Sequence, residues 1–313
     1  MMLSLIYRRK LVYSLGDAIH SLAGGQCNKL LMLTSYLFLR IMRKPPVFTV
    51  LLEKTFPYRF IIAKMTKVPP VRRLLDRMLF SHTNLTYLFR DSLVEISVDR
   101  SIQPPDSMVL PSQIVDRFIR NASHRFIMDF CICRQAMHCQ NHPVELGCLF
   151  LGDAVKDIDP AYGKGVGLEA ALAHVQKCRK EGLIHLIGRD RIDETWLQVK
   201  SNGKLMTICN CCSCCCLWKW LPELDPSIRS KVKRMPGVTV YVTNDCRGCG
   251  TCVDVCFMHA IQLNNDKACI SDECRGCGRC VDACPYQAMR LRIDDEMFLE
   301  KTMERVVSAV DIA

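Results

Sequence analysis

The sequence predicts an α+β protein built from three parts and a closing helix. We expect a basic, mostly helical N-terminal region over residues 1–112 and a cysteine-rich middle domain over 113–236. A small domain with internal pseudo-two-fold symmetry follows over 237–294, and a surface helix over 295–313. Three observations lead to this division. The 313 residues suffice for two or three small domains, most of the 21 cysteines lie in three blocks, and one segment repeats itself.

Positive charge is concentrated in the N-terminal region. The chain has a net charge of +10, whereas residues 1–80 hold 14 Lys or Arg and 3 Asp or Glu, a balance of +11. The pairs Pro45–Pro46 and Pro69–Pro70 divide this region into helices. A concentrated basic face suggests an acidic partner, and we expect a redox protein with an acidic docking face. A peripheral membrane contact and a merely solvated surface are the alternatives. Nucleic acid is disfavoured because aromatic residues are not interleaved with the basic ones.

The longest apolar stretch is too short to cross a membrane. It runs over residues 30–42 and contains Arg40, whereas about 18–20 apolar residues are needed. We expect a buried helix closed by Pro45–Pro46, with a helix lying on a membrane surface as the alternative. Asp17 and His20 interrupt the only segment that resembles a secretory signal. An odd number of cysteines does not suit a closed disulfide framework, so we expect a cytoplasmic protein, with contact at the inner membrane face as the alternative.

The middle of the chain shows two helical patterns and one strand pattern. The segment "SLVEISVDR" over 92–100 is typical of a strand. A helix is expected after Pro111, with apolar residues at Ile114, Val115 and Phe118. A second helix, "GLEAALAHVQKCRKEG", should end at Gly182.

The repeated segment carries the most specific signal. "CRGCGTCVDVC" begins at Cys246 and "CRGCGRCVDAC" at Cys274, an offset of 28 residues. Each copy has the spacing C-x2-C-x2-C-x3-C, which suits a cubane [4Fe–4S] cluster. Three cysteines on one tight loop reach three irons, and the fourth ligand comes from elsewhere. The glycines within each copy let the backbone wrap closely and point N–H groups at sulfur. Between the copies, "AIQLNNDKACI" predicts two short strands joined at Asn264–Asn265–Asp266.

We therefore expect two [4Fe–4S] clusters, each bound by three cysteines of one copy and the last cysteine of the other. The expected ligands of cluster one are Cys246, Cys249, Cys252 and Cys284, and those of cluster two are Cys274, Cys277, Cys280 and Cys256. A zinc ribbon needs only two C-x2-C knuckles, so eight repeated cysteines argue against it.

Residues 238–293 resemble the bacterial-type two-[4Fe–4S] ferredoxin domain, which makes the predicted C-terminal domain ferredoxin-like. The resemblance implies two clusters and one-electron transfer. This sequence departs from the pattern at one point: Pro285 follows Cys284 as expected, but Phe257 follows Cys256. The departure concerns the local turn and leaves the number of ligands unchanged.

Ten more cysteines lie in the middle domain, and a subset of them is expected to hold one or two further centres. They are Cys131, Cys133, Cys139 and Cys148 in one block and Cys209, Cys211, Cys212, Cys214, Cys215 and Cys216 in the other. Adjacent side chains of an extended chain point to opposite faces, so Cys211 and Cys212 should diverge and the second block cannot serve one centre. Pairing part of it with the first block would complete four-thiolate sites.

Three interpretations of these cysteines stay open. In order of preference they are further iron–sulfur clusters, a structural zinc site that His138 or His142 could join, and a thiol redox or substrate site. Because cysteines are plentiful, ordinary loop roles are favoured for the two histidines.

Four motifs resemble those of a group of dicluster iron–sulfur proteins from anaerobic microbes. They are "CICR" at 131–134, "GCLFLG" at 147–152, "GLIHLIGR" at 182–189 and "CNCCSCCCLW" at 209–218. The resemblance covers about 113–293 and implies an anaerobic redox role without naming a substrate. We expect an electron carrier or oxidoreductase subunit. The alternatives are an electron-fed reductase with a catalytic centre in the middle domain, and a cluster scaffold or carrier.

Overall fold

The computed structural model describes residues 45–91, 111–295 and 297–313. The chain divides into two compact units between Phe48 and Thr49, and the larger unit, from Thr49 onward, contains every strand and every cysteine of the described residues. The apolar helix expected over 30–42 and the strand expected over 92–100 lie outside the described residues. No helix among the described residues is both long and apolar enough to cross a membrane.

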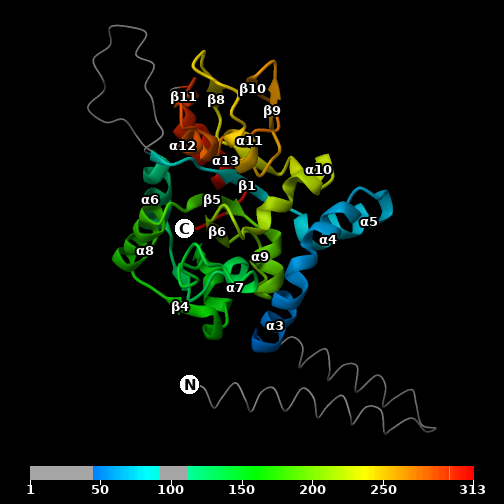
Figure 1. Cartoon of the computed structure of the whole chain (residues 1–313). Coiled ribbons are helices and arrows are strands. Elements are labelled where there is room, and N and C mark those ends of the chain that lie inside the picture. The colour runs from blue at the N-terminus through cyan, green and yellow to red at the C-terminus, as the bar shows by residue number, and fades with distance from the viewer. Residues whose placement is uncertain (1–44, 92–110, 296) are drawn as a thin grey trace, which may run out of the picture. The chain divides into compact units, whose positions relative to one another are not determined.

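A seven-stranded sheet forms the centre of the larger unit (Figure 1). The strand order is β4-β2-β3-β6-β5-β1-β7, and all neighbours are antiparallel except β1 and β7. The strands are β1 (Asn84–Tyr87), β2 (Arg125–Met128), β3 (Leu149–Leu151), β4 (Gly163–Gly165), β5 (Ile184–Arg189), β6 (Met206–Cys211) and β7 (Val232–Arg234). The sequence did not predict β1, which lies ahead of the segment expected to form the middle domain. β6 pairs with both β3 and β5, so its cysteine-rich end is held in the middle of the sheet.

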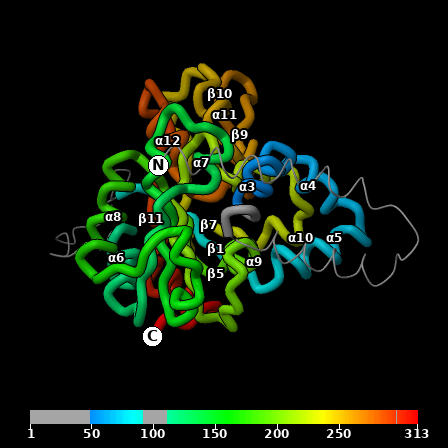
Figure 2. Tube along the Cα trace, turned by 90° about the horizontal axis from the view of Figure 1, so that it is seen from below, coloured from blue at the N-terminus to red at the C-terminus, as the bar shows by residue number. Residues whose placement is uncertain are grey.

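Two helices pack beside each other on the sheet, α6 (Pro111–Asn121) and α8 (Leu168–Lys180) (Figures 1 and 2). Both expected helices are confirmed. α6 buries Ile114, Val115, Phe118 and Ile119, the stripe that its apolar spacing predicts. α8 ends just before Gly182, whose φ of +74° is one that glycine adopts without strain.

Short helices surround the other elements. Before β1 lie α3 (Pro45–Thr55), η1 (Phe56–Tyr58), α4 (Arg59–Met65), α5 (Pro69–Leu75) and η2 (Asp76–Phe80). Pro45 begins α3 and Pro69 begins α5, because proline fits the first turn of a helix. The remaining short helices are α7 (Ile132–Ala136), η4 (Asp153–Asp157), η5 (Pro160–Tyr162), α9 (Arg191–Trp196), η6 (Leu217–Glu223) and α10 (Pro226–Arg229). α4 packs on η6, and the Asp225 backbone N–H beyond η6 donates to the Thr66 hydroxyl at 2.8 Å.

The C-terminal elements form two small sheets and two short helices. β8 (Val238–Val242) pairs with β11 (Met289–Ile293), and β9 (Ile261–Asn264) pairs with β10 (Lys267–Ile270). The expected hairpin is confirmed, and its turn places Asn265 and Asp266 at φ of 48° and 55°, as a two-residue turn with two positive φ angles requires. The two helices are α11 (Thr251–Val255) and α12 (Arg279–Ala283), one in each copy of the repeat.

The last helix, α13 (Phe298–Val307), was expected on the surface, but it buries part of its side chains. Phe298, Leu299 and Val306 are buried in the same apolar cluster as residues of α6 and of the sheet. A helix with one apolar stripe gains stability by burying it, so α13 ties the end of the chain to the middle elements.

Phe257, the departure from the repeat pattern, has a packing role. It belongs to an apolar cluster that joins Leu186 of the sheet to Met258 of the cysteine repeat. The ring centroid of Phe257 lies 5.4 Å from that of Tyr87 in β1, and the Arg279 guanidinium lies 5.2 Å from the Phe257 ring centroid. The aromatic ring therefore fills the contact between the repeat and the sheet, which a proline would fill less well.

Candidate metal centres

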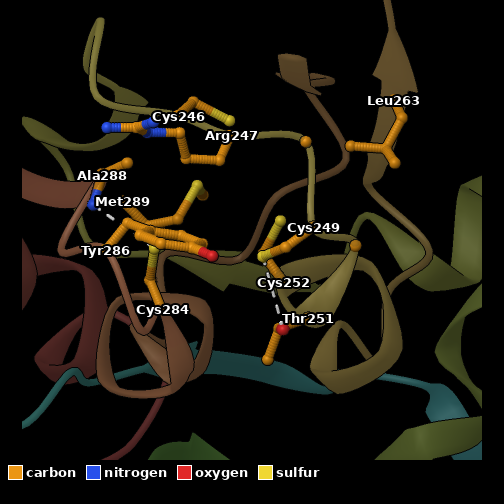
Figure 3. A pocket seen from close by; sticks show the side chains of 12 residues that line it. Cys246, Arg247, Cys249, Thr251, Cys252, Leu263, Cys284, Tyr286, Ala288 and Met289 are labelled. Carbon is orange, nitrogen blue, oxygen red and sulfur yellow. Dashed lines mark hydrogen bonds between the residues drawn. The ribbon is translucent and has the colours of Figure 1, made fainter. Parts of the chain in front are cut away.

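The structure brings together the four cysteines expected to bind cluster one. Cys246, Cys249, Cys252 and Cys284 surround a single pocket, and we call them the first cysteine set (Figure 3). The first two lie on the loop before α11, Cys252 lies in α11, and Cys284 follows α12. Burial and the three neighbouring thiolates raise the pKa of Cys252, so the four sulfur atoms are close enough to interact.

The loop of the first set depends on one glycine in particular. Gly248 has a φ of +64°, and a Cβ atom there would lie 2.5 Å from the backbone oxygen of Asp266. Only glycine fits this approach between the loop and the β9–β10 turn. The sequence expectation that glycine lets the loop wrap tightly agrees with this geometry.

The cysteines expected to bind cluster two also lie together. Burial raises the pKa of Cys280, and the thiolates of Cys277, Cys274 and Cys256 raise it further, followed by that of Cys252 from the first set. We call Cys256, Cys274, Cys277 and Cys280 the second cysteine set. Three of them come from the second copy of the repeat, and Cys256 comes from the end of α11 in the first copy.

Backbone N–H groups point at sulfur in both sets. The Ala260 N–H donates to Cys256 Sγ at 3.4 Å, and the Ala288 N–H donates to Cys284 Sγ at 3.3 Å, two contacts related by the 28-residue offset. The Gly276 N–H also donates to Cys274 Sγ at 3.4 Å. Such hydrogen bonds stabilise negative charge on sulfur and tune a bound cluster. The donor set and its surroundings therefore fit an iron–sulfur cofactor.

The ten middle-domain cysteines form two groups that meet at Cys212. Seven of them line a cavity of ≈ 190 Å³. Six of these seven are called the cavity cysteines: Cys131, Cys133, Cys148, Cys209, Cys211 and Cys216. The other four have Sγ atoms that all lie within 4.8 Å of one another and are called the tight cysteine group: Cys139, Cys212, Cys214 and Cys215. Cys212 also contributes to the cavity wall.

Strand pairing explains how the cavity cysteines meet. Cys209 and Cys211 lie two residues apart in β6, so their side chains share one face. Cys148 directly precedes β3, the neighbour of β6, and its Sγ lies 3.8 Å from that of Cys209. Cys131 precedes α7, and hydrogen bonding from the Cys133 thiol lowers its pKa to about 7, against burial, which raises it.

Two buried carboxyl groups line the same cavity, Asp190 and Asp193. Burial raises the pKa of Asp193 to about 6, although hydrogen bonds from Trp196 and Thr207 oppose this shift. The Trp196 indole N–H and the Thr207 hydroxyl each donate to Asp193 at 2.8 Å. Sequence reasoning missed both aspartates; their position directly after β5 was the available signal. The cavity thus combines thiols with a carboxyl group able to exchange a proton near neutral pH.

Arg134 supplies buried positive charge between the two groups. Its side chain is fully buried and donates to the backbone oxygens of Pro143 at 2.8 Å, Asn210 at 2.9 Å and Leu146. Burial acts to lower the pKa of Arg134, but the thiolates of Cys131, Cys212 and Cys148 outweigh it and raise the pKa. The guanidinium therefore stays charged and offsets part of the negative charge of the thiolates.

A neutral histidine of β5 supports the neighbouring strand β6. Burial lowers the pKa of His185 to about 3, so its imidazole is uncharged. Arg179 Nε donates to His185 Nε2 at 3.3 Å, which leaves the proton on Nδ1 to donate to Asn210 Oδ1 at 2.9 Å. The Asn210 amide in turn donates to the Gly147 backbone oxygen at 2.7 Å. This chain of hydrogen bonds fixes Asn210, and with it the cysteines on either side.

The two candidate histidines and the two described cysteines outside the blocks do not join the tight cysteine group. In the part of the chain that the structure describes, the tight group consists of cysteines alone. His142 Nδ1 instead lies 3.4 Å from Glu181 Oε1, and His138 has a φ of 48° in the turn after α7. Cys178 is buried beside His174, Cys269 is exposed on β10, and Cys27 lies outside the described residues.

Arg279 connects the second set with the end of β6. It begins α12, between Cys277 and Cys280, and its guanidinium donates to the backbone oxygens of Cys212 at 2.9 Å and Cys211 at 3.4 Å. Burial acts to lower the pKa of Arg279, but neighbouring groups, above all Cys277, raise it. One buried cation therefore lies next to cysteines of the second set and also contacts the backbone of two cysteines that line the cavity.

Comparison with known proteins identifies one segment. A family model described as a 4Fe-4S dicluster domain matches residues 245–288. No match was found among curated proteins or among solved structures. The chain thus carries a ferredoxin-like 4Fe–4S domain near its C-terminal end, within an α+β fold, and has an iron–sulfur electron-transfer role.

Proposed function

We propose that the protein is a cytoplasmic one-electron carrier in which each cysteine set holds one [4Fe–4S] cluster. When bound, the two clusters accept and release single electrons at low potential. The observation that carries this proposal is the grouping of the eight repeat cysteines into two fourfold sets, each completed by a residue of the other copy. The 20 cysteines of the described residues are all unpaired, which supports a reducing compartment.

The residues around the two sets differ in charge, and this difference is expected to set the direction of electron transfer within the carrier. Arg279 in the second copy stands where the first copy has Thr251. A buried cation favours the addition of an electron, so the second set should have the higher reduction potential. Electrons are then expected to collect at the second set, on the side of the molecule that contacts β6.

The cavity favours a second candidate function, an electron-fed reductase. Cys256, Cys274 and Cys277 of the second set pack against the same apolar cluster that buries Cys211 and Cys216. Tyr87 belongs to this cluster too, and burial together with the thiolates of Cys216, Cys211 and Cys277 raises its pKa. A metal centre held by the cavity cysteines would lie beside the second set, with Asp193 as a nearby proton donor.

A reductive titration of the anaerobically purified full chain tests both candidates. The carrier proposal predicts uptake of two electrons by two interacting paramagnetic centres, one for each set. The reductase proposal predicts further electrons and a third signal that cyanide alters, because a catalytic iron has an open coordination position. Fewer than two one-electron centres would rule out the carrier. A titration that stops at two electrons, with no cyanide-sensitive signal, would rule out the reductase.

We propose an acidic redox protein as the partner of the N-terminal helices. Exposed basic residues accompany exposed apolar ones on α4, on α5, in the turn between these helices and on η2. The basic residues are Lys64, Lys67, Arg73 and Arg77, and the apolar ones are Ile61, Met65, Val68, Leu74 and Met78. Apolar contacts ringed by charge suit docking to a protein of opposite charge.

Charge reversal tests this docking surface. Replacing Lys64, Arg73 and Arg77 by glutamate is expected to slow electron transfer from an acidic flavodoxin, used as the probe, by roughly tenfold or more at low ionic strength. The control replaces Lys177 and Lys180, two exposed lysines on α8, by glutamate. Stopped-flow reduction measures the rate. An unchanged rate would contradict the proposal, as would loss of binding to phosphatidylserine vesicles with no change toward flavodoxin.

A further inference from the structure

The tight cysteine group joins two segments that are distant in sequence. Cys212, Cys214 and Cys215 lie in the turn directly after β6, and Cys139 lies in the loop after α7. The Sγ atoms of Cys139 and Cys214 lie 3.5 Å apart, and all four Sγ atoms lie within 4.8 Å of one another. Four thiols at this separation surround a space for one atom.

The size of this space distinguishes a single ion from a cluster. A tetrahedral metal ion with bonds of about 2.3 Å to sulfur holds its four sulfur ligands about 3.8 Å apart. A cubane puts irons and sulfides between its cysteines and therefore spreads them farther. Among the residues described by the structure, neither the first nor the second cysteine set forms a group as tight as this one.

The local backbone also suits a single ion. Cys212 and Cys215 have the C-x2-C spacing of a zinc knuckle. The Cys215 backbone N–H donates to Cys212 Sγ at 3.3 Å, which stabilises negative charge on that sulfur. The buried guanidinium of Arg134 interacts with the thiolate of Cys212 and offsets part of the excess negative charge of four thiolates around a divalent ion.

We propose that Cys139, Cys212, Cys214 and Cys215 bind one mononuclear metal ion as a tetrathiolate, with zinc as the expected occupant. Zinc is favoured because divalent zinc binds such sites more tightly than divalent iron. The ion joins the α7 loop to the end of β6. These two segments also carry Cys133, Cys211 and Cys216 of the cavity, so the ion holds two walls of the cavity in place. The site is independent of the clusters proposed for the ferredoxin domain.

The test is a comparison of metal content between variants of the full chain purified without oxygen. Cys214→Ala and Cys139→Ala each remove one ligand, from different segments, so the result does not depend on the folding of one variant. Cys178→Ala is the matched control, because Cys178 is a buried thiol that packs against Cys212 and Cys215 outside the group. Iron, sulfide and zinc are counted per chain, and X-ray absorption at the zinc edge reports the ligands.

The proposal predicts one zinc per wild-type chain, with four sulfur neighbours at about 2.3 Å. Both ligand variants should lose this zinc and keep the iron of the first and second cysteine sets, whereas Cys178→Ala should keep both metals. One iron with four sulfur ligands and no sulfide, lost in the same variants, would support the same site with another occupant. A wild-type chain without any mononuclear metal would overturn the proposal. So would zinc that both ligand variants retain, or loss of iron and sulfide together in Cys139→Ala.

Discussion

Replacing Cys284 by alanine is expected to abolish the intact [4Fe–4S] cluster of the first cysteine set, although Cys284 belongs to the second copy of the repeat. Cys284 shares its pocket with Cys246, Cys249 and Cys252, and its sulfur accepts the Ala288 N–H. A cubane with three cysteine ligands loses an iron or falls apart, so between about one and four irons should be lost. The change is measured as iron per chain and as the loss of one of the two electron paramagnetic resonance signals.

Variants of ligands from both copies of the repeat test the expected crossover directly. Cys284→Ala and Cys249→Ala should remove the same signal, while Cys256→Ala and Cys277→Ala should remove the other. Cys269→Ala, which changes an exposed cysteine outside both sets, should keep both signals. If Cys284→Ala instead removed the signal lost in Cys277→Ala, the crossover between the copies would be wrong.

Replacing Arg279 by threonine is expected to lower the reduction potential of the second set by about 100 mV. A unit charge about 7 Å from a redox centre contributes about 2.4 kcal/mol at an effective dielectric constant of about 20. For one electron this energy corresponds to about 100 mV. The substitution gives the second copy the residue that the first copy has at Thr251, so the potentials of the two sets should converge.

A potentiometric titration monitored by electron paramagnetic resonance measures both potentials. Arg292→Thr is the matched control, because it removes a half-exposed arginine from β11 of the same domain. It should shift either potential far less, since water screens its charge. If Arg279→Thr and Arg292→Thr shifted the second potential equally, Arg279 would have no particular influence on it.

The ferredoxin-like segment was the most predictable part of the chain, because its signals are local. The cysteine spacing and the Asn265–Asp266 turn depend on neighbours a few residues away, and the structure forms the turn where the sequence predicts it. The stripe of α6 was also readable, since Ile114 and Phe118 recur at the helical period.

The middle domain was predictable only in part, because its site depends on distant strand pairing. Alternation along an extended chain indicated that Cys211 and Cys212 diverge, and only Cys212 belongs to the tight cysteine group, although both line the cavity. It could not indicate that Cys148 meets Cys209, which depends on the pairing of β3 with β6. Nor could it indicate the raised pKa of Asp193, because burial is a property of the folded chain.

Two further features depend on contacts between segments that are distant in the sequence. Strand β1 covers only Asn84–Tyr87, and its pairing with β5 and β7 decides its conformation more than its own residues do. Phe257 stands where the motif has proline, and the contact of its ring with Tyr87 and Arg279 is visible only in the folded chain. A residue that departs from a motif, such as Phe257, can thus mark the surface by which the motif-bearing segment contacts the rest of the chain.

Counting iron, acid-labile sulfide and zinc in the full chain, purified without oxygen, decides whether the two cysteine sets hold two clusters. Two cubanes require about eight irons and eight sulfides per chain. We expect at least this number, together with one mononuclear metal ion, and only iron accompanied by additional sulfide would be assigned to the cavity cysteines. About four irons or fewer in fully loaded protein would contradict the central claim that the two cysteine sets hold two [4Fe–4S] clusters.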